Sequence, residues 1–241
     1  MTVSAALAAL SKALADFWQP RILALALVPP LAALAVWVGL AWLFADDWAR
    51  AVSAWIANTS WLGWVRDWGL SAIFVWASGI GAIALMLPVA LITAVLVTDL
   101  VAMPVIVPFV GQRHFPRLEQ CKGGTVVGSL WNAAVAVIVF AVLWTISLPL
   151  WFTGIGALAL PPLISAYFNQ RMFRYDALAE HASPEEYRMI LRHAGGSLFA
   201  LGLLLSGLLY IPIVNLAVPV LSALAFTHLC LSELARMRVG A

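Results

Sequence analysis

Residues 195–231 read GGSLFALGLLLSGLLYIPIVNLAVPVLSALAFTHLCL and contain no Asp, Glu, Lys or Arg. Three residues that disfavour helix interrupt the run where a single transmembrane helix would have its centre: Pro212, Asn215 and Pro219. The run therefore predicts a helical hairpin. Its apolar arms, residues 198–211 and 216–231, would reach only roughly 21 to 24 Å at 1.5 Å per residue, against roughly 30 Å of bilayer hydrocarbon. Because the tip carries no charge, we predict a re-entrant hairpin that penetrates the membrane only in part.

A second uncharged run, residues 125–168, has the same character. Pro149, the Gly154–Gly156 segment and Pro161-Pro162 interrupt it, and its tip also lacks charge. The arm that starts at Ala157 is too short to cross the bilayer before charged residues begin. We predict a second hairpin of partial depth.

Composition places both hairpins in a polytopic membrane protein. Hydrophobic residues make up 64% of the 241 residues, charged residues make up 10%, and the mean hydropathy is +1.00. A soluble domain has about 25% charged residues, so the phospholipid bilayer is the expected partner. The net charge of +2 gives no argument for nucleic acid. We predict an all-α fold with a single membrane domain spanning residues 1–241.

The first hundred residues predict one surface helix and two long transmembrane helices. Residues 1–21 form an interfacial amphipathic helix, with its apolar face on Val3, Leu7, Leu10, Leu14, Phe17 and Trp18 and its polar side on Ser4, Ser11, Lys12 and Asp16. Residues 22–44, with a kink at Pro29-Pro30, and residues 69–98 are the two crossings. The tryptophan-rich loop 45–68 between them resembles an aromatic belt. We expect an interfacial turn at residues 100–110, where Pro104 and Pro108 lie.

Residues 169–194 form the one substantial aqueous segment, predicted to be cytoplasmic. Ser183 and Glu186 match a capping box that starts a short amphipathic helix ending at Arg192. Arg188 and Arg192 are as well suited to lipid headgroups as to a substrate. Of the 13 Lys and Arg residues, only Arg50 and Arg66 lie in loop 45–68. The positive-inside rule then places both termini in the cytoplasm of a multi-pass inner-membrane protein.

Catalytic motifs are missing from the linear sequence. We find no paired carboxylates, no histidine and acid cluster, and no serine in a nucleophile-elbow context, so we do not expect an enzyme. Cys121 and Cys230 are too few and too far apart for a disulfide framework or a tetrahedral metal site. His228, inside an apolar run, is expected to be a hydrogen-bonded structural residue rather than a proton relay. We expect neither a metal nor a cofactor.

The broken helices do suit an anion path, because helix N-termini at membrane depth favour negative charge. Arg21 is the one cation near the start of the first crossing; it either binds the anion or extends to the lipid interface. Asn215 at the hairpin tip either satisfies carbonyls that the prolines free or contacts a solute.

Four short motifs resemble the CysZ sulfate-transporter family and its relatives among the etoposide-induced membrane proteins. They are Gln19-Pro20, Ala102-Met103-Pro104, Thr153-Gly-Ile-Gly156 and Ile211-Pro-Ile-Val-Asn215-Leu. The resemblance implies two long crossing helices, two partly penetrating hairpins, a cytoplasmic helical portion, homo-oligomeric assembly and sulfate uptake.

One stretch departs from the sulfate-transporting members. After the Gln-Pro pair those members carry a glycine, an aliphatic residue and two arginines, whereas this chain reads Arg21-Ile22-Leu23-Ala24 and only Ile22 matches. The candidate anion-binding residues are Gln19, Arg21 and Ile22. Either Arg21 compensates for the missing pair, or the chain handles another solute or none.

Two functions follow. The first is passive permeation of sulfate or a related anion, since no intramembrane Asp or Glu indicates proton coupling. The alternative is a non-transporting membrane assembly or scaffold protein of the same fold.

Overall fold

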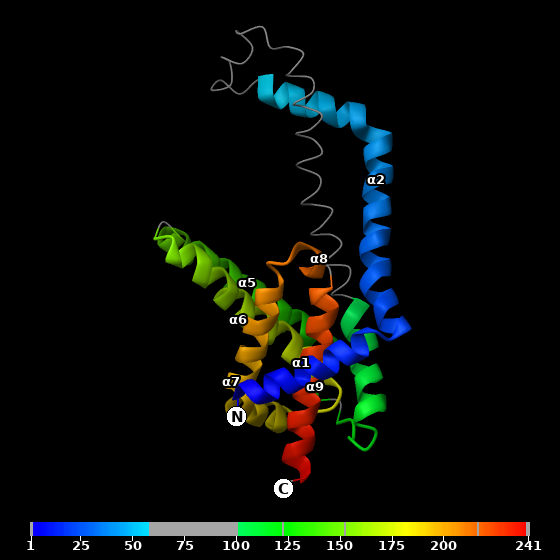
Figure 1. Cartoon of the computed structure of the whole chain (residues 1–241), viewed down its shortest axis with the longest axis vertical. Helices are drawn as coiled ribbons and strands as arrows, with labels where there is room; N and C mark the ends of the chain where they lie inside the picture. Colours follow the sequence, from blue (N-terminus) through cyan, green and yellow to red (C-terminus); the bar gives the residue numbers. More distant parts are fainter. Residues whose placement is uncertain (1, 58–100, 122, 152, 216, 240–241) are drawn as a thin grey trace. The chain divides into compact units, whose positions relative to one another are not determined.

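A computed structural model describes residues 2–57, 101–121, 123–151, 153–215 and 217–239 (Figure 1). Within these ranges every regular element is a helix, as the predicted all-α fold requires. The chain divides into two compact units: Met1–Ala26 together with Thr98–Ala241, and Leu27–Val97. Of the buried apolar residues that the structure describes, nearly all lie in the first unit.

Helix α9 (Val218–Val239) is the centre of the first unit. All of residues 218–231 are buried, and α1, α6 and α7 pack against the helix (Figure 1). Its middle alternates small and large side chains, among them Ala223, Ala225 and Phe226, each fully buried. Small residues let neighbouring helices approach closely, which is how apolar helices gain packing energy when lipid offers the same polarity as protein.

Helix α1 (Thr2–Phe17) packs against α7 and α9 through its small residues. Ala6, Ala9 and Ala13 face the core, whereas the larger apolar side chains Val3, Leu7, Leu14 and Trp18 are exposed. An exposed apolar stripe of this kind fits the predicted interfacial helix. The expectation for Asp16 was wrong, because this residue, expected on the polar side, is only 4% exposed.

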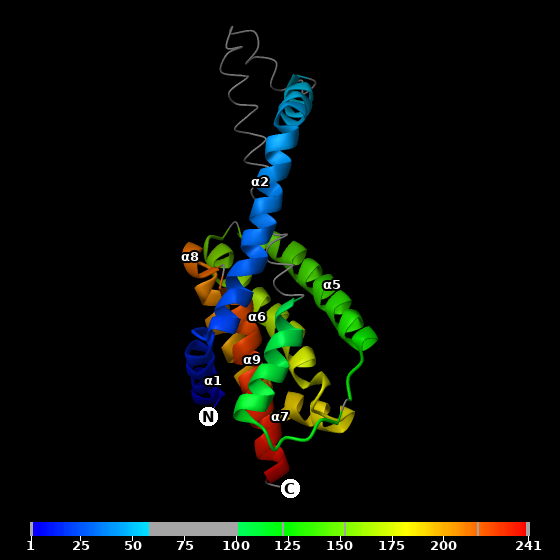
Figure 2. The same cartoon turned by 90° about the vertical axis from the view of Figure 1, so that its right-hand side faces the viewer.

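Helices α5 (Val126–Trp151) and α6 (Ile155–Ala179) pack side by side (Figure 2). The turn between them contains Gly154 at φ 72°, a left-handed conformation that favours glycine. Helix α6 runs without a break through Pro161 and Pro162 and has 25 residues, about 37 Å in length. The helix extends well beyond residue 168, where the uncharged run ends, because charged residues do not end a helix.

Helices α7 (Pro184–Leu208) and α9 are joined by the one-turn helix α8 (Pro212–Asn215). The predicted capping box at Ser183 and Glu186 is confirmed. The helix it starts continues to Leu208, so the expected short helix ending at Arg192 was wrong. With 25 and 22 residues, α7 and α9 are about 37 and 33 Å long. Arm length therefore gives no argument against a full crossing, and the partial depth of both hairpins stays a prediction.

Residues 101–114 are helical, so the interfacial turn expected at residues 100–110 was wrong. The buried residues recur at helical spacing along one face: Ala102, Met103, Ile106, Val107 and Val110. This periodicity was present in the sequence, but Pro104 and Pro108 directed the interpretation to a turn. The helix joins the same core as α1 and α9.

Helix α2 (Pro20–Ala57) starts in the first unit and supplies the described part of the second. It continues through Pro29 and Pro30 and includes residues 45–57, which were expected to be loop. An exposed ion pair joins Arg50 and Asp47 there. The predicted crossing at 69–98 and the rest of loop 45–68 lie outside the described residues.

Among the described residues, four segments are long and apolar enough to cross a bilayer: Pro20–Phe44, Val127–Trp151, Pro184–Leu208 and Val218–Val239. This number fits the multi-pass membrane protein that composition predicts.

Candidate functional site

The corner between α1 and α2 holds the three predicted anion-binding residues. The Gln19 backbone N–H donates to the Asp16 carbonyl at 3.0 Å, and the Gln19 carbonyl accepts from the N–H groups of Ile22 and Leu23 at 3.0 and 2.9 Å. Arg21 is exposed in the first turn of α2, Gln19 is half-buried, and Ile22 is fully buried in the core. Arg21 is therefore the member of the trio whose side chain is available to a solute at this corner.

Asn215, the fourth predicted residue, ends α8. Its side chain is exposed, and its backbone N–H donates to the Ile211 carbonyl at 2.9 Å. The structure does not bring α8 to the α1–α2 corner (Figure 1). The predicted residues thus form two separate places rather than one pocket.

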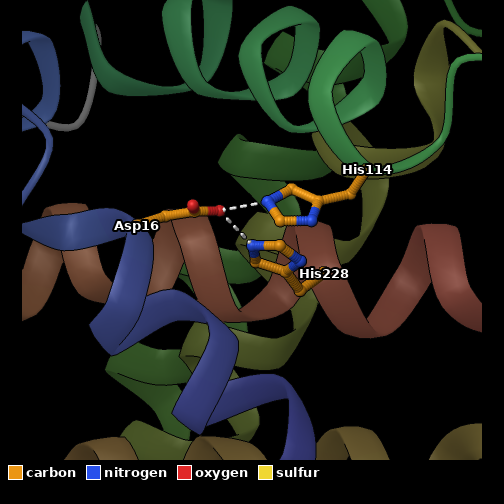
Figure 3. Close-up of side chains that lie close together, drawn as sticks. All are labelled: Asp16, His114 and His228. Carbon is orange, nitrogen blue, oxygen red and sulfur yellow. Dashed lines mark hydrogen bonds and ion pairs between the residues drawn. The ribbon is translucent and has the colours of Figure 1, made fainter.

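A different set of side chains does converge. Asp16 near the end of α1, His114 at the end of helix 101–114, and His228 in α9 meet within the first unit (Figure 3). The Asp16 Oδ2 atom lies 2.7 Å from His114 Nε2 and 2.8 Å from His228 Nε2. The two imidazole rings meet nearly edge to face, with centroids 4.7 Å apart and planes at 70°. Both Nε2 atoms therefore point at one carboxylate oxygen.

Two of the three members of this Asp16–His114–His228 cluster are buried in the core. The side chains of Asp16 and His228 are 5% and 1% exposed, whereas that of His114 is 31% exposed. A buried carboxylate is costly without compensating partners. The two imidazoles supply them at Oδ2, and the half-exposed Arg113 places Nε 3.6 Å from Oδ1. His228 Nδ1 is buried and has no hydrogen-bond partner among the described residues.

A second polar network ties α9 to the start of α7. The Arg238 guanidinium donates to both Glu186 carboxylate oxygens at 2.8 and 3.0 Å, and to the His181 carbonyl at 2.7 Å. It also donates to the Glu119 carbonyl at 2.9 Å and to Cys121 Sγ at 3.2 Å. Bidentate charge-assisted contacts of this kind fix geometry strongly. We call this set the Arg238 clasp.

His181, between α6 and α7, lies beside the clasp and is 3% exposed. Burial lowers the pKa of His181 below its ordinary value of 6.5, Glu180 opposes this shift, and Arg238 adds to it. The imidazole is therefore favoured in its neutral form within the folded protein.

Comparison with known proteins identifies the family. A model of the family described as sulfate transporter CysZ/etoposide-induced protein 2.4 matches residues 9–219. The chain belongs to this family. Comparison with curated proteins and with solved structures gives no match. Membership in the CysZ/etoposide-induced family makes the chain a sulfate-transporter-like membrane protein, and the match includes the α1–α2 corner and α8 but ends before His228.

No histidine and acid cluster is recognisable in the linear sequence, but the fold forms one. Asp16 lies 98 residues from His114 and 212 residues from His228 along the chain. One signal was present, because a titratable residue inside an apolar run needs a polar partner, and His228 lies in such a run. Nothing in the sequence indicated which residue that partner would be.

Proposed function

We propose that the protein conducts sulfate or a related inorganic anion passively across a bacterial-type inner membrane, as a homo-oligomer with both termini in the cytoplasm. Family membership over residues 9–219 is the observation that carries this proposal. No covalent step is involved.

Arg21 is the residue we assign to anion recruitment. It is exposed in the first turn of α2, where the helix dipole also favours negative charge. A guanidinium matches the oxygens of an oxyanion through paired N–H donors. The spans Pro20–Phe44 and Val127–Trp151 contain no Asp or Glu. The acidic residues of the other two spans lie near helix ends, Glu185 and Glu186 in the first turn of α7 and Glu233 toward the end of α9, which supports a passive route over proton coupling.

Radiolabelled sulfate uptake into proteoliposomes tests the proposal. Arg21→Ala is expected to lower the initial rate about tenfold, the equivalent of one charge-assisted hydrogen bond. Arg192→Ala, which removes an exposed arginine from α7, is the matched control and should retain the wild-type rate. Wild-type vesicles that take up sulfate no faster than protein-free vesicles would refute the proposal.

The alternative, a membrane assembly or scaffold protein, draws on the surface around Arg188. This exposed arginine lines a cavity of about 240 Å³ with Tyr175 and Tyr187, between the end of α6 and the start of α7. The double charge reversal Arg188→Glu with Arg192→Glu separates the two functions. A transporter keeps its sulfate flux, whereas an assembly protein shows no flux in either form and changes its elution volume in gel filtration.

A further inference from the structure

The Asp16–His114–His228 cluster has the composition of a transition-metal site. Two imidazole nitrogens and one carboxylate oxygen suit first-row divalent ions, and Zn²⁺ above all, whereas Mg²⁺ and Ca²⁺ prefer all-oxygen ligand sets. Three protein ligands with a position left for water is a common arrangement for zinc. We propose that these three residues bind a zinc-class divalent cation, a role that lies beyond the proposed anion permeation.

The geometry supports one cation between the three side chains. Their potential ligand atoms all lie within 4.8 Å of one another. Ligand atoms around a tetrahedral ion are about 3.3 Å apart when each bond is about 2.0 Å. The present 2.7 and 2.8 Å separations at Asp16 Oδ2 need to open by only about half an ångström. Small side-chain rotations provide that change.

The tautomers of the two histidines are also adjustable. Both Nε2 atoms contact Asp16 Oδ2 (Figure 3). A carboxylate oxygen can only accept, so this arrangement assigns a proton to each Nε2. A cation replaces both protons at this point, and each neutral ring then carries its proton on Nδ1. The chemistry needs no other co-reactant.

The exposure of the cluster and the orientation of its carboxylate are both compatible with a bound ion. The 31% exposed His114 side chain leaves one side of the cluster open, while Asp16 and His228 form the buried side. Arg113 contacts Asp16 Oδ1 rather than Oδ2, so it can orient the carboxylate without occupying the oxygen that the imidazoles share. The positive charges of Arg113 and Lys12 lie nearby and oppose a cation, so we expect moderate rather than very tight affinity.

A cation at this place would link three parts of the chain that are remote in sequence. It would join α1 to helix 101–114 and to the central helix α9. Ligands that bind only the folded state raise its stability. Metal binding should therefore raise the Tm of the whole chain.

The experiment uses the full chain in detergent, stripped of metal with a chelator, in a Cys121→Ser background. Cys121 is an exposed thiol that could hold zinc on its own account. Co²⁺ titration followed by visible absorption reports the ligand field, metal analysis after dialysis against Zn²⁺ gives stoichiometry, and Tm is measured with Zn²⁺ and with Mg²⁺. We expect one equivalent per chain and a Tm rise with Zn²⁺ but not with Mg²⁺.

Matched variants separate a metal site from a purely hydrogen-bonded cluster. Asp16→Asn keeps the shape and a hydrogen-bond acceptor but removes the anionic ligand, and His114→Gln changes the most exposed member. Each should weaken binding at least about 100-fold, the upper end of what losing a supporting residue costs. His193→Gln removes an exposed histidine on α7, whose Nδ1 lies 2.9 Å from the Met189 carbonyl, and should bind like the parent.

Three results would overturn the proposal: no stoichiometric binding by the parent protein, equal binding by Asp16→Asn and His114→Gln, or equal stabilisation by Mg²⁺. Because His114 is partly exposed, its variant is expected to fold even if a change at the buried His228 does not. None of these results bears on sulfate flux.

Discussion

Helices α5 and α9 are both long and apolar enough to cross a membrane, α5 being the more apolar of the two, yet they have opposite surroundings in the fold. In the most apolar 18-residue window of α5, 11% of the residues are buried; in that of α9, 83% are buried. Leu130, Trp131 and Ile138 of α5 are between 61% and 72% exposed. The contrast teaches that hydropathy identifies a segment for the membrane but does not say whether lipid or protein will surround it.

Small residues explain part of the difference. Helix α9 places Ala223, Ala225 and Ser222 where other helices approach, and all three are buried. Close packing of such helices supplies van der Waals contacts that lipid chains cannot match. The exposed face of α5 carries large side chains, which suit acyl chains or a second copy of the protein.

The largest expected effect comes from truncating matched leucines on the two helices. Leu224→Ala in α9 removes a fully buried side chain and should lower the free energy of unfolding by about 3 kcal/mol. Leu130→Ala in α5 changes a 72% exposed side chain and should stay within about 0.5 kcal/mol. Unfolding in detergent, followed by tryptophan fluorescence, measures both. Equal losses would show that α5 is as tightly packed as α9.

The next largest effect on stability is expected from substituting a pair of glycines in α7. A Cβ atom at Gly202 would come within 2.6 Å of the Ala166 carbonyl oxygen of α6, so Gly202→Ala should cost about 2 kcal/mol. Gly195→Ala meets nothing within 4 Å and should stabilise the helix by about 0.5 to 1 kcal/mol. Thermal unfolding of the two variants should therefore move Tm in opposite directions. Movement in the same direction would contradict the close α6–α7 contact.

A smaller effect is expected at the Arg238 clasp. Arg238→Ala removes several charge-assisted donors and should cost about 1 to 2 kcal/mol. Arg236→Ala breaks only an exposed pair with Glu233, whose arginine side chain is 68% exposed, and should cost less than about 0.5 kcal/mol. Limited proteolysis near residues 115–121 gives a second readout, because the clasp holds that connection through the Glu119 carbonyl. If both variants behave alike, α9 is held by its apolar packing alone.

The smallest effect concerns His181, where α6 meets α7. Burial lowers the pKa of His181, so the unfolded chain binds a proton more readily than the folded one. Stability should then decline as the pH falls below 6.5, the ordinary value, and continue to decline until the folded-state pKa is passed. His181→Gln should reduce this decline, as measured by Tm at about pH 7.5 and about pH 5.5. His193→Gln, at an exposed position, should keep the parental slope.

Family and fold class could be predicted from sequence because they depend on composition and on local pattern. An all-helical membrane protein of the CysZ/etoposide-induced family could be predicted from the uncharged runs, the Ser183 capping box and four short motifs. Helix ends were predicted less well. Charged residues after 168 and prolines at 104 and 108 were interpreted as boundaries, whereas the helices continue through them.

The sequence by itself determined that bilayer lipid is the solvent of this chain, because too few charged residues are present to cover a soluble surface. Only the tertiary structure decided that α9 is the core helix and that α5 is exposed, since both patterns are apolar all round. It alone brought Asp16, His114 and His228 together. The physical reason is that a buried polar group needs a partner, but chain separation does not limit which segment of a packed fold supplies it.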